Sequence, residues 1–169
     1  MPAVSSVAFV TIAAGMTAAT VVDIRTRRIP NELTAALAGI GLGLSAAGVS
    51  GISVWASMLG FVVGLALMMP GHVLGATGAG DVKLMAAVGA IVGPALVVTA
   101  FLFTAVAGGV LAVVVAARRR RLSATLAGTG RLVAGSAETR AQLRSAPAAS
   151  RFAYGPAIAV GSILAALVG

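Results

Sequence analysis

The stretch that decides the fold runs from Leu33 to Gly80 and reads LTAALAGIGLGLSAAGVSGISVWASMLGFVVGLALMMPGHVLGATGAG. It contains one titratable side chain, His72. It is also more than twice as long as the roughly 20 residues that a helix needs to cross the hydrocarbon layer. We therefore expect two membrane spans, over about Leu33–Val49 and Ile52–Met69, joined by a glycine-containing turn at residues 48–51.

Three more uncharged runs flank this stretch. Pro2 to Val22 is long enough for one crossing, and Phe152 to Gly169 lies near the lower limit of about 17 residues. Leu84 to Ala117 is interrupted at Gly93-Pro94, and we expect two short helices there rather than one tilted helix. The sequence thus predicts an all-α bundle of about six transmembrane helices in a single domain, residues 1–169.

The distribution of positive charge supports this count. With six spans, all 12 Lys and Arg residues fall on one side of the membrane, in segments 23–32, 70–83 and 118–151. A single helix over residues 84–117 would place Arg118 to Arg121 on the opposite side, against the bias of positive charge toward the cytoplasm. We expect both termini outside, and residues 118–151 to form a basic cytoplasmic linker beside anionic headgroups.

Composition excludes several classes of function. Hydrophobic residues make up 59% of the chain and charged residues 9%, too few charges to solvate a soluble domain of this size. The absence of Cys excludes disulfide scaffolds and Cys-ligated metal sites, and the single His excludes a His-rich metal site. The net charge of +8 comes without interleaved aromatic residues, which argues against nucleic acid as a partner. We expect no cofactor and no metal.

Four G-x-x-x-G pairs occur in the apolar runs. Such pairs allow helix backbones to approach closely in lipid, and we interpret them as packing sites without chemistry. They are Gly39/Gly43, Gly60/Gly64, Gly71/Gly75 and Gly89/Gly93.

The candidate catalytic residues are acidic. Asp23 directly follows the first predicted span, and Asp81 directly precedes the fourth, so both are expected at the cytoplasmic boundary, where they can meet. Two carboxylates at a partly dehydrated boundary repel, so one holds a proton while the other stays ionised, an arrangement that activates water. In the alternative interpretation, each is a solvated helix-cap residue, with Asp23 beside Arg25.

Asp81 ends a glycine-rich turn of the pattern G-x-G-D. Gly78 and Gly80 precede it and would let the backbone turn tightly and admit an extended substrate strand beside the carboxylate.

The chain resembles the type IV prepilin peptidases, membrane aspartyl proteases of the G-x-G-D type. The resemblance rests on three stretches, DIRTRRIPN over Asp23–Asn31, GAGDVKLM over Gly78–Met85 and FAYGPA over Phe152–Ala157. It implies that Asp23 and Asp81 are the catalytic pair and that Gly78 and Gly80 form a supporting loop. The short length is similar to the branch serving tight-adherence (Flp-type) pili.

The function implied by this resemblance is cleavage of the leader peptide of prepilin or pseudopilin substrates. It would take place at the cytoplasmic face of the bacterial inner membrane. Methyl transfer is not expected, because the paired Cys motifs associated with it in longer family members are absent from this sequence. Two other functions stay open at this point: a small ion- or proton-coupled transporter, and a non-catalytic membrane subunit of a pilus-assembly machine.

Four residues near the motifs receive structural interpretations. Pro70 is expected to end the third span, and Asn31 to act as the N-cap of the second. Lys83 would extend to the membrane interface. His72 is expected to be an interfacial residue without a catalytic role.

Overall fold

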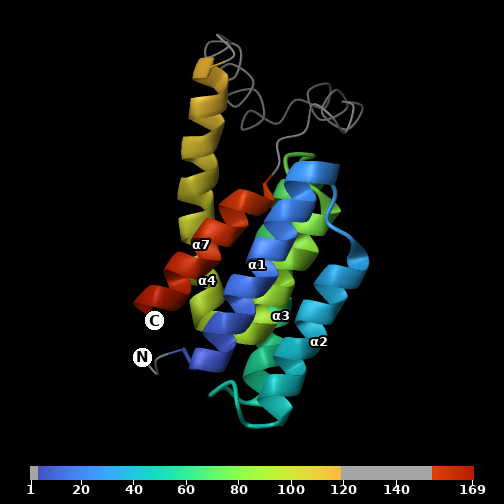
Figure 1. Ribbon diagram of the computed structural model, residues 1–169, viewed down its shortest axis with the longest axis vertical. Helices are drawn as coiled ribbons and strands as arrows, with labels where there is room; N and C mark the ends of the chain where they lie inside the picture. Colours follow the sequence, from blue (N-terminus) through green and yellow to red (C-terminus); the bar gives the residue numbers. More distant parts are fainter. Residues whose placement is uncertain (1–3, 119–153) are drawn as a thin grey trace.

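A computed structural model describes residues 4–118 and 154–169 (Figure 1). Every helix or strand assigned within these residues is an α-helix, which confirms the predicted all-α class. The helices are α1 (Ser6–Thr26), α2 (Asn31–Ala46), α3 (Val54–Val73), α4 (Ala79–Arg118) and α7 (Gly155–Val168). The predicted linker over residues 118–151 lies, beyond Arg118, outside the described residues.

Three of the described helices are long and apolar enough to cross a membrane: α1, α3 and the part of α4 from Ala79 to Val114. The apolar helix α7 has 14 residues and α2 has 16, both fewer than the roughly 20 residues of a typical span. The predicted count of about six spans is therefore not confirmed.

The predicted interruption of the apolar run from Leu84 to Ala117 is present at Gly93. Its φ of 83° and ψ of 177° are not helical, and Pro94 has no backbone N–H to continue the helix. In Figure 1, the green first part of α4 runs along α3, and the yellow second part returns toward the end of the bundle where α4 began. The two short helices expected here are thus joined by a sharp reversal.

Close packing of α3 against α4 depends on glycine. A Cβ atom added at Gly60 would overlap the carbonyl oxygen of Gly89, and one added at Gly89 would overlap that of Gly60. The Ser57 hydroxyl donates to the Ala90 carbonyl across the same crossing, at 2.5 Å. The packing role predicted for these glycines is confirmed. It is not found for Gly39 and Gly43 of α2, where an added Cβ would meet nothing within 4 Å among the residues that the structure describes.

The ends of α2 and α3 show one correct prediction and two errors. Gly48 and Gly51 form the predicted turn, both with positive φ. However, α3 continues through Pro70 to Val73, because a proline near a helix end still provides a carbonyl, which here accepts from the Leu74 N–H. The N-cap of α2 is Pro30, and Asn31 is the first helical residue.

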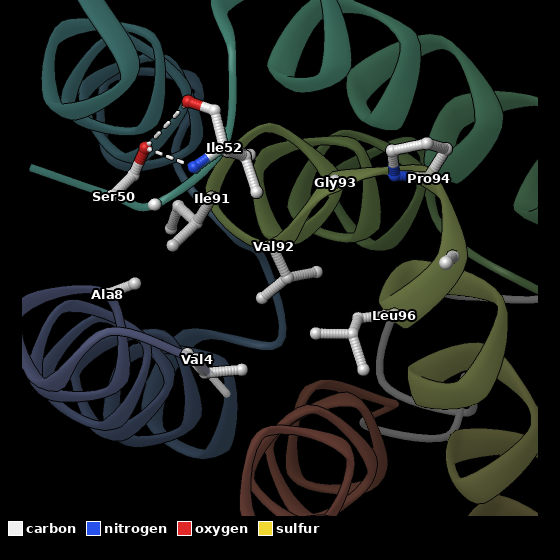
Figure 2. Close-up of a pocket in the computed structure, with 11 residues that line it drawn as sticks. Val4, Ala8, Ser50, Ile52, Ile91, Val92, Gly93, Pro94 and Leu96 are labelled. Atoms are coloured by element: carbon white, nitrogen blue, oxygen red, sulfur yellow. Dashed lines mark hydrogen bonds between the residues drawn. The ribbon is translucent and has the colours of Figure 1, made fainter. Parts of the chain in front are cut away.

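An apolar cavity of about 160 Å³ lies where α4 reverses (Figure 2). Its walls come from the start of α1, the turn after α2 and residues 91–96 of α4. Ala8 of α1 lines it, and the separation of 15 positions from Ala8 to Asp23 corresponds to about 22 Å of helix. The cavity is therefore at the opposite end of α1 from Asp23.

Candidate active site

α1 ends and α4 begins at the same end of the bundle (Figure 1). Asp23 belongs to that end of α1 and Asp81 to that end of α4. Asp23 is in the last turns of α1 and is 5% exposed, and Asp81 is in the first turn of α4 and is 7% exposed. Their carboxylates are close enough to interact electrostatically. The structure thus brings together the two aspartates that the sequence analysis singled out, and it buries both.

The Asp23 carboxylate is bound by the start of α7. Its Oδ2 accepts a hydrogen bond from the backbone N–H of Gly155 at 2.9 Å. Gly155 is the first residue of α7, where helical N–H groups lack partners within the helix and favour negative charge. The interpretation of Asp23 as a solvated cap beside Arg25 is wrong, because the side chain is buried and contacts a helix 132 positions away.

The Asp81 carboxylate caps the helix on which it lies. Its Oδ2 accepts from the Gly78 N–H at 2.9 Å, while the Gly78 carbonyl accepts from the N–H groups of Asp81 and Val82. The side-chain bond is one half of a capping box, in which the third helical residue binds the backbone of the N-cap residue; Gly78 has no side chain to supply the other half. The cap interpretation of Asp81 is therefore correct, although the carboxylate is buried rather than solvated.

Gly78 and Gly80 support the site in a different way from the one expected. Neither has a positive φ; the positive φ in this turn belongs to Gly75, at 79°. A Cβ on Gly78 would come within 3.2 Å of Asp81 Oδ2, and one on Gly80 within 3.0 Å of the Ile29 Cβ. The two glycines thus provide room for close contacts. The tight backbone turn lies earlier in the chain, at Gly75.

Tyr154 was not singled out as a site residue by the sequence analysis, yet it lies beside the aspartates. Burial raises the pKa of its phenol, and the negative charge of nearby Asp81 raises it further. The ring packs against α4, where a Cβ on Gly108 would come within 2.6 Å of the Tyr154 hydroxyl oxygen. The signal that could have identified it is its position in the third motif stretch, next to Gly155.

The rim of the site carries polar and charged groups. His72 is exposed, its Nδ1 lies 3.2 Å from the Thr77 carbonyl oxygen, and it interacts electrostatically with Asp81. Lys83 is exposed as expected, but its ammonium group is bound: Nζ donates to Oδ1 of Asn31 at 2.7 Å. The Asn31 side chain therefore contacts α4 instead of capping α2.

A pair of buried carboxylates that repel one another can supply both an acid and a base. One member of such a pair retains a proton and can act as an acid, while the ionised member can act as a base. The backbone N–H groups of Gly78 and Gly155 hold one oxygen of each carboxylate, so the orientation of the pair is set by the chain itself.

Comparison with known proteins gives one family match. No curated protein and no solved structure gives a significant match to the chain. A sequence model described as the type IV leader peptidase family matches residues 10–113, a region that contains both aspartates and both loop glycines but not α7. Because this match covers more than half of the chain, the protein belongs to the type IV leader peptidase family.

Proposed function

We propose that this protein is an aspartic-type endopeptidase that removes the leader peptide of prepilin-like substrates. The observation that carries the proposal is the pair of buried, interacting carboxylates, Asp23 and Asp81, supplied by different helices within the region that matches a leader peptidase family. A pair of this kind supplies the acid and the base that hydrolysis of an amide by water requires.

In the proposed mechanism, one aspartate is ionised and the other is protonated. The ionised carboxylate takes a proton from a water molecule as that water adds to the scissile carbonyl carbon. The protonated carboxylic acid donates its proton to the carbonyl oxygen, which gives a neutral tetrahedral diol. Return of a proton to the leaving nitrogen breaks the C–N bond and releases an amine and a carboxylic acid. No covalent enzyme intermediate forms.

The proposed orientation places this reaction at the cytoplasmic face. Arg25, Arg28 and Lys83 are exposed at the same end of the bundle as the aspartates, and positive charge is enriched on the cytoplasmic side of membrane proteins. The apolar helix of the substrate would lie in the bilayer against the bundle, and its leader would reach the carboxylates. A substrate from a tight-adherence pilus and a bacterial inner-membrane location belong to this proposal.

Substitution of each aspartate tests the proposal. The purified full-length protein in lipid nanodiscs would be incubated with a prepilin encoded beside its own gene, and leader removal followed by mass spectrometry. We expect Asp23→Asn and Asp81→Asn each to abolish cleavage. Glu32→Gln is the matched control, because Glu32 is an exposed acid in the first turn of α2. Full activity in either aspartate variant would remove the pair from the mechanism.

A further inference from the structure

Two contacts join the chain that follows α1 to the start of α4: one from Ile29 and one from Asn31, the first residue of α2. The Ile29 side chain is buried against Gly80, close enough that a Cβ on Gly80 would lie 3.0 Å from the Ile29 Cβ and 3.2 Å from its carbonyl oxygen. Two residues further on, Asn31 Oδ1 accepts from Lys83 Nζ at 2.7 Å. We call these four residues, Ile29, Asn31, Gly80 and Lys83, the brace.

The brace lies next to both aspartates. Asp81 stands between Gly80 and Lys83 in the sequence. Asp23 is in the last turns of α1, and the chain leaves that helix through Arg27, whose φ of 55° directs it toward the brace. The position at which the segment is held therefore sets where α1 ends relative to α4.

Direct packing between α1 and α4 is sparse, whereas α1 and α4 each pack more extensively against α7. The distance between Asp23 and Asp81 thus depends on other connections as well. One passes through α7, whose Gly155 N–H binds Asp23. Another is the brace, which ties the segment after α1 and the first residue of α2 to the start of α4.

We propose that Asn31 and Lys83 are positioning residues, whose hydrogen bond holds the aspartate pair at its working separation. This inference rests on the proposed peptidase function. Both side chains are exposed, so the bond is not needed to fill the core. Its role is geometric, and geometric errors of about 1 Å in a catalytic arrangement can lower a rate by roughly 100-fold.

The kinetic test uses a double-mutant cycle with prepilin as substrate. Lys83→Met and Asn31→Leu should each lower kcat by about tenfold and leave KM within about twofold, because reacting groups rather than substrate contacts are displaced. The double variant should be no slower than either single variant, since both remove the same bond. Lys83→Arg, which retains a donor, should restore most of the rate.

The kinetic test has one control variant and two outcomes that would contradict the proposal. Arg25→Met removes one exposed cation from the same end of the bundle and should leave kcat unchanged. If Lys83 served only as a headgroup anchor, Asn31→Leu would have wild-type activity. If Lys83 contacted the substrate, Lys83→Met would raise KM. Either of these results would overturn the proposal.

A distance measurement tests the brace independently of activity. The chain has no Cys, so spin labels can be attached only at introduced cysteines. Ile24→Cys and Ala79→Cys place labels at exposed positions beside Asp23 and at the start of α4. Lys83→Met should shift or broaden the distance distribution between the labels in lipid nanodiscs. An unchanged distribution would refute the brace, whereas absence of prepilin cleavage by the unlabelled wild-type protein would count against the peptidase function instead.

Discussion

Replacing Gly155 with alanine would place a methyl group against the Asp23 carboxylate. The added Cβ would lie 2.7 Å from Oδ2 and 3.1 Å from both the Cβ and the Cγ of Asp23. Ordinary contact begins near 3.4 Å, so the carboxylate must move by about 0.7 Å. Movement away from α7 would lengthen the bond from the Gly155 N–H from 2.9 Å to as much as about 3.6 Å, where little hydrogen bonding remains.

The expected cost of this substitution follows from the bond that it breaks. A hydrogen bond to a charged group contributes about 1.5–3 kcal/mol, which corresponds to roughly 10- to 100-fold in a rate if the loss falls on the transition state. Gly155 does not have a positive φ, and alanine is the better helix former, so the protein should fold. We therefore expect Gly155→Ala to lower kcat about 10- to 100-fold with little change in the thermal unfolding midpoint.

The assay is steady-state cleavage of prepilin in nanodiscs, with thermal unfolding measured on the same samples. Gly39→Ala is the matched control, because the same methyl group on α2 would meet no described residue within 4 Å. Wild-type kcat in Gly155→Ala would refute the reasoning, since the carboxylate would then tolerate a displacement that the geometry requires. Loss of kcat in Gly39→Ala would show that the effect is not specific to Asp23.

Two further substitutions test close contacts of α4, one with α3 and one with the segment after α1. Gly60→Ala should lower the free energy of unfolding by about 1–3 kcal/mol, because its Cβ would overlap the Gly89 carbonyl oxygen and force α3 away from α4. Gly43→Ala is the control and should leave the free energy of unfolding unchanged, because its Cβ would meet no described residue within 4 Å. Denaturant unfolding of both variants checks this, and equal stabilities would contradict it. Gly80→Ala should lower kcat and leave KM near the wild-type value, because a Cβ 3.0 Å from that of Ile29 must push the segment after α1 outward. Cleavage kinetics decide this, and an unaltered kcat would show that the Ile29 contact does not position the aspartates.

Much of the helical layout could be predicted from local sequence. Long uncharged runs have to satisfy their backbone hydrogen bonds internally in lipid, which favours helices, and glycine and proline mark where those helices stop. This reasoning correctly located the turn at Gly48–Gly51 and the break at Gly93. It failed at Pro70 and Asn31, because the end of a helix depends on which neighbouring groups satisfy the last few polar atoms.

The number of spans could not be derived in the same way. Uncharged length sets an upper limit on how much chain the membrane can hold, but the observed α2 and α7 are shorter than the runs that predicted them. Where turns and caps remove residues from a run, the helix that remains falls below the length of a typical crossing.

By itself, the sequence determined that the protein is helical and apolar. It also determined that Asp23 and Asp81 are the candidates for catalysis, because the chain has too few charged side chains to offer many other candidate residues. Only the tertiary structure decided what surrounds that pair: the Gly155 N–H on Asp23, Tyr154 beside Asp81 and the bond from Lys83 to Asn31. These partners come from chain segments far apart in sequence. Helical periodicity is local and carries no record of which helices meet, so contacts of this kind arise only when the bundle closes.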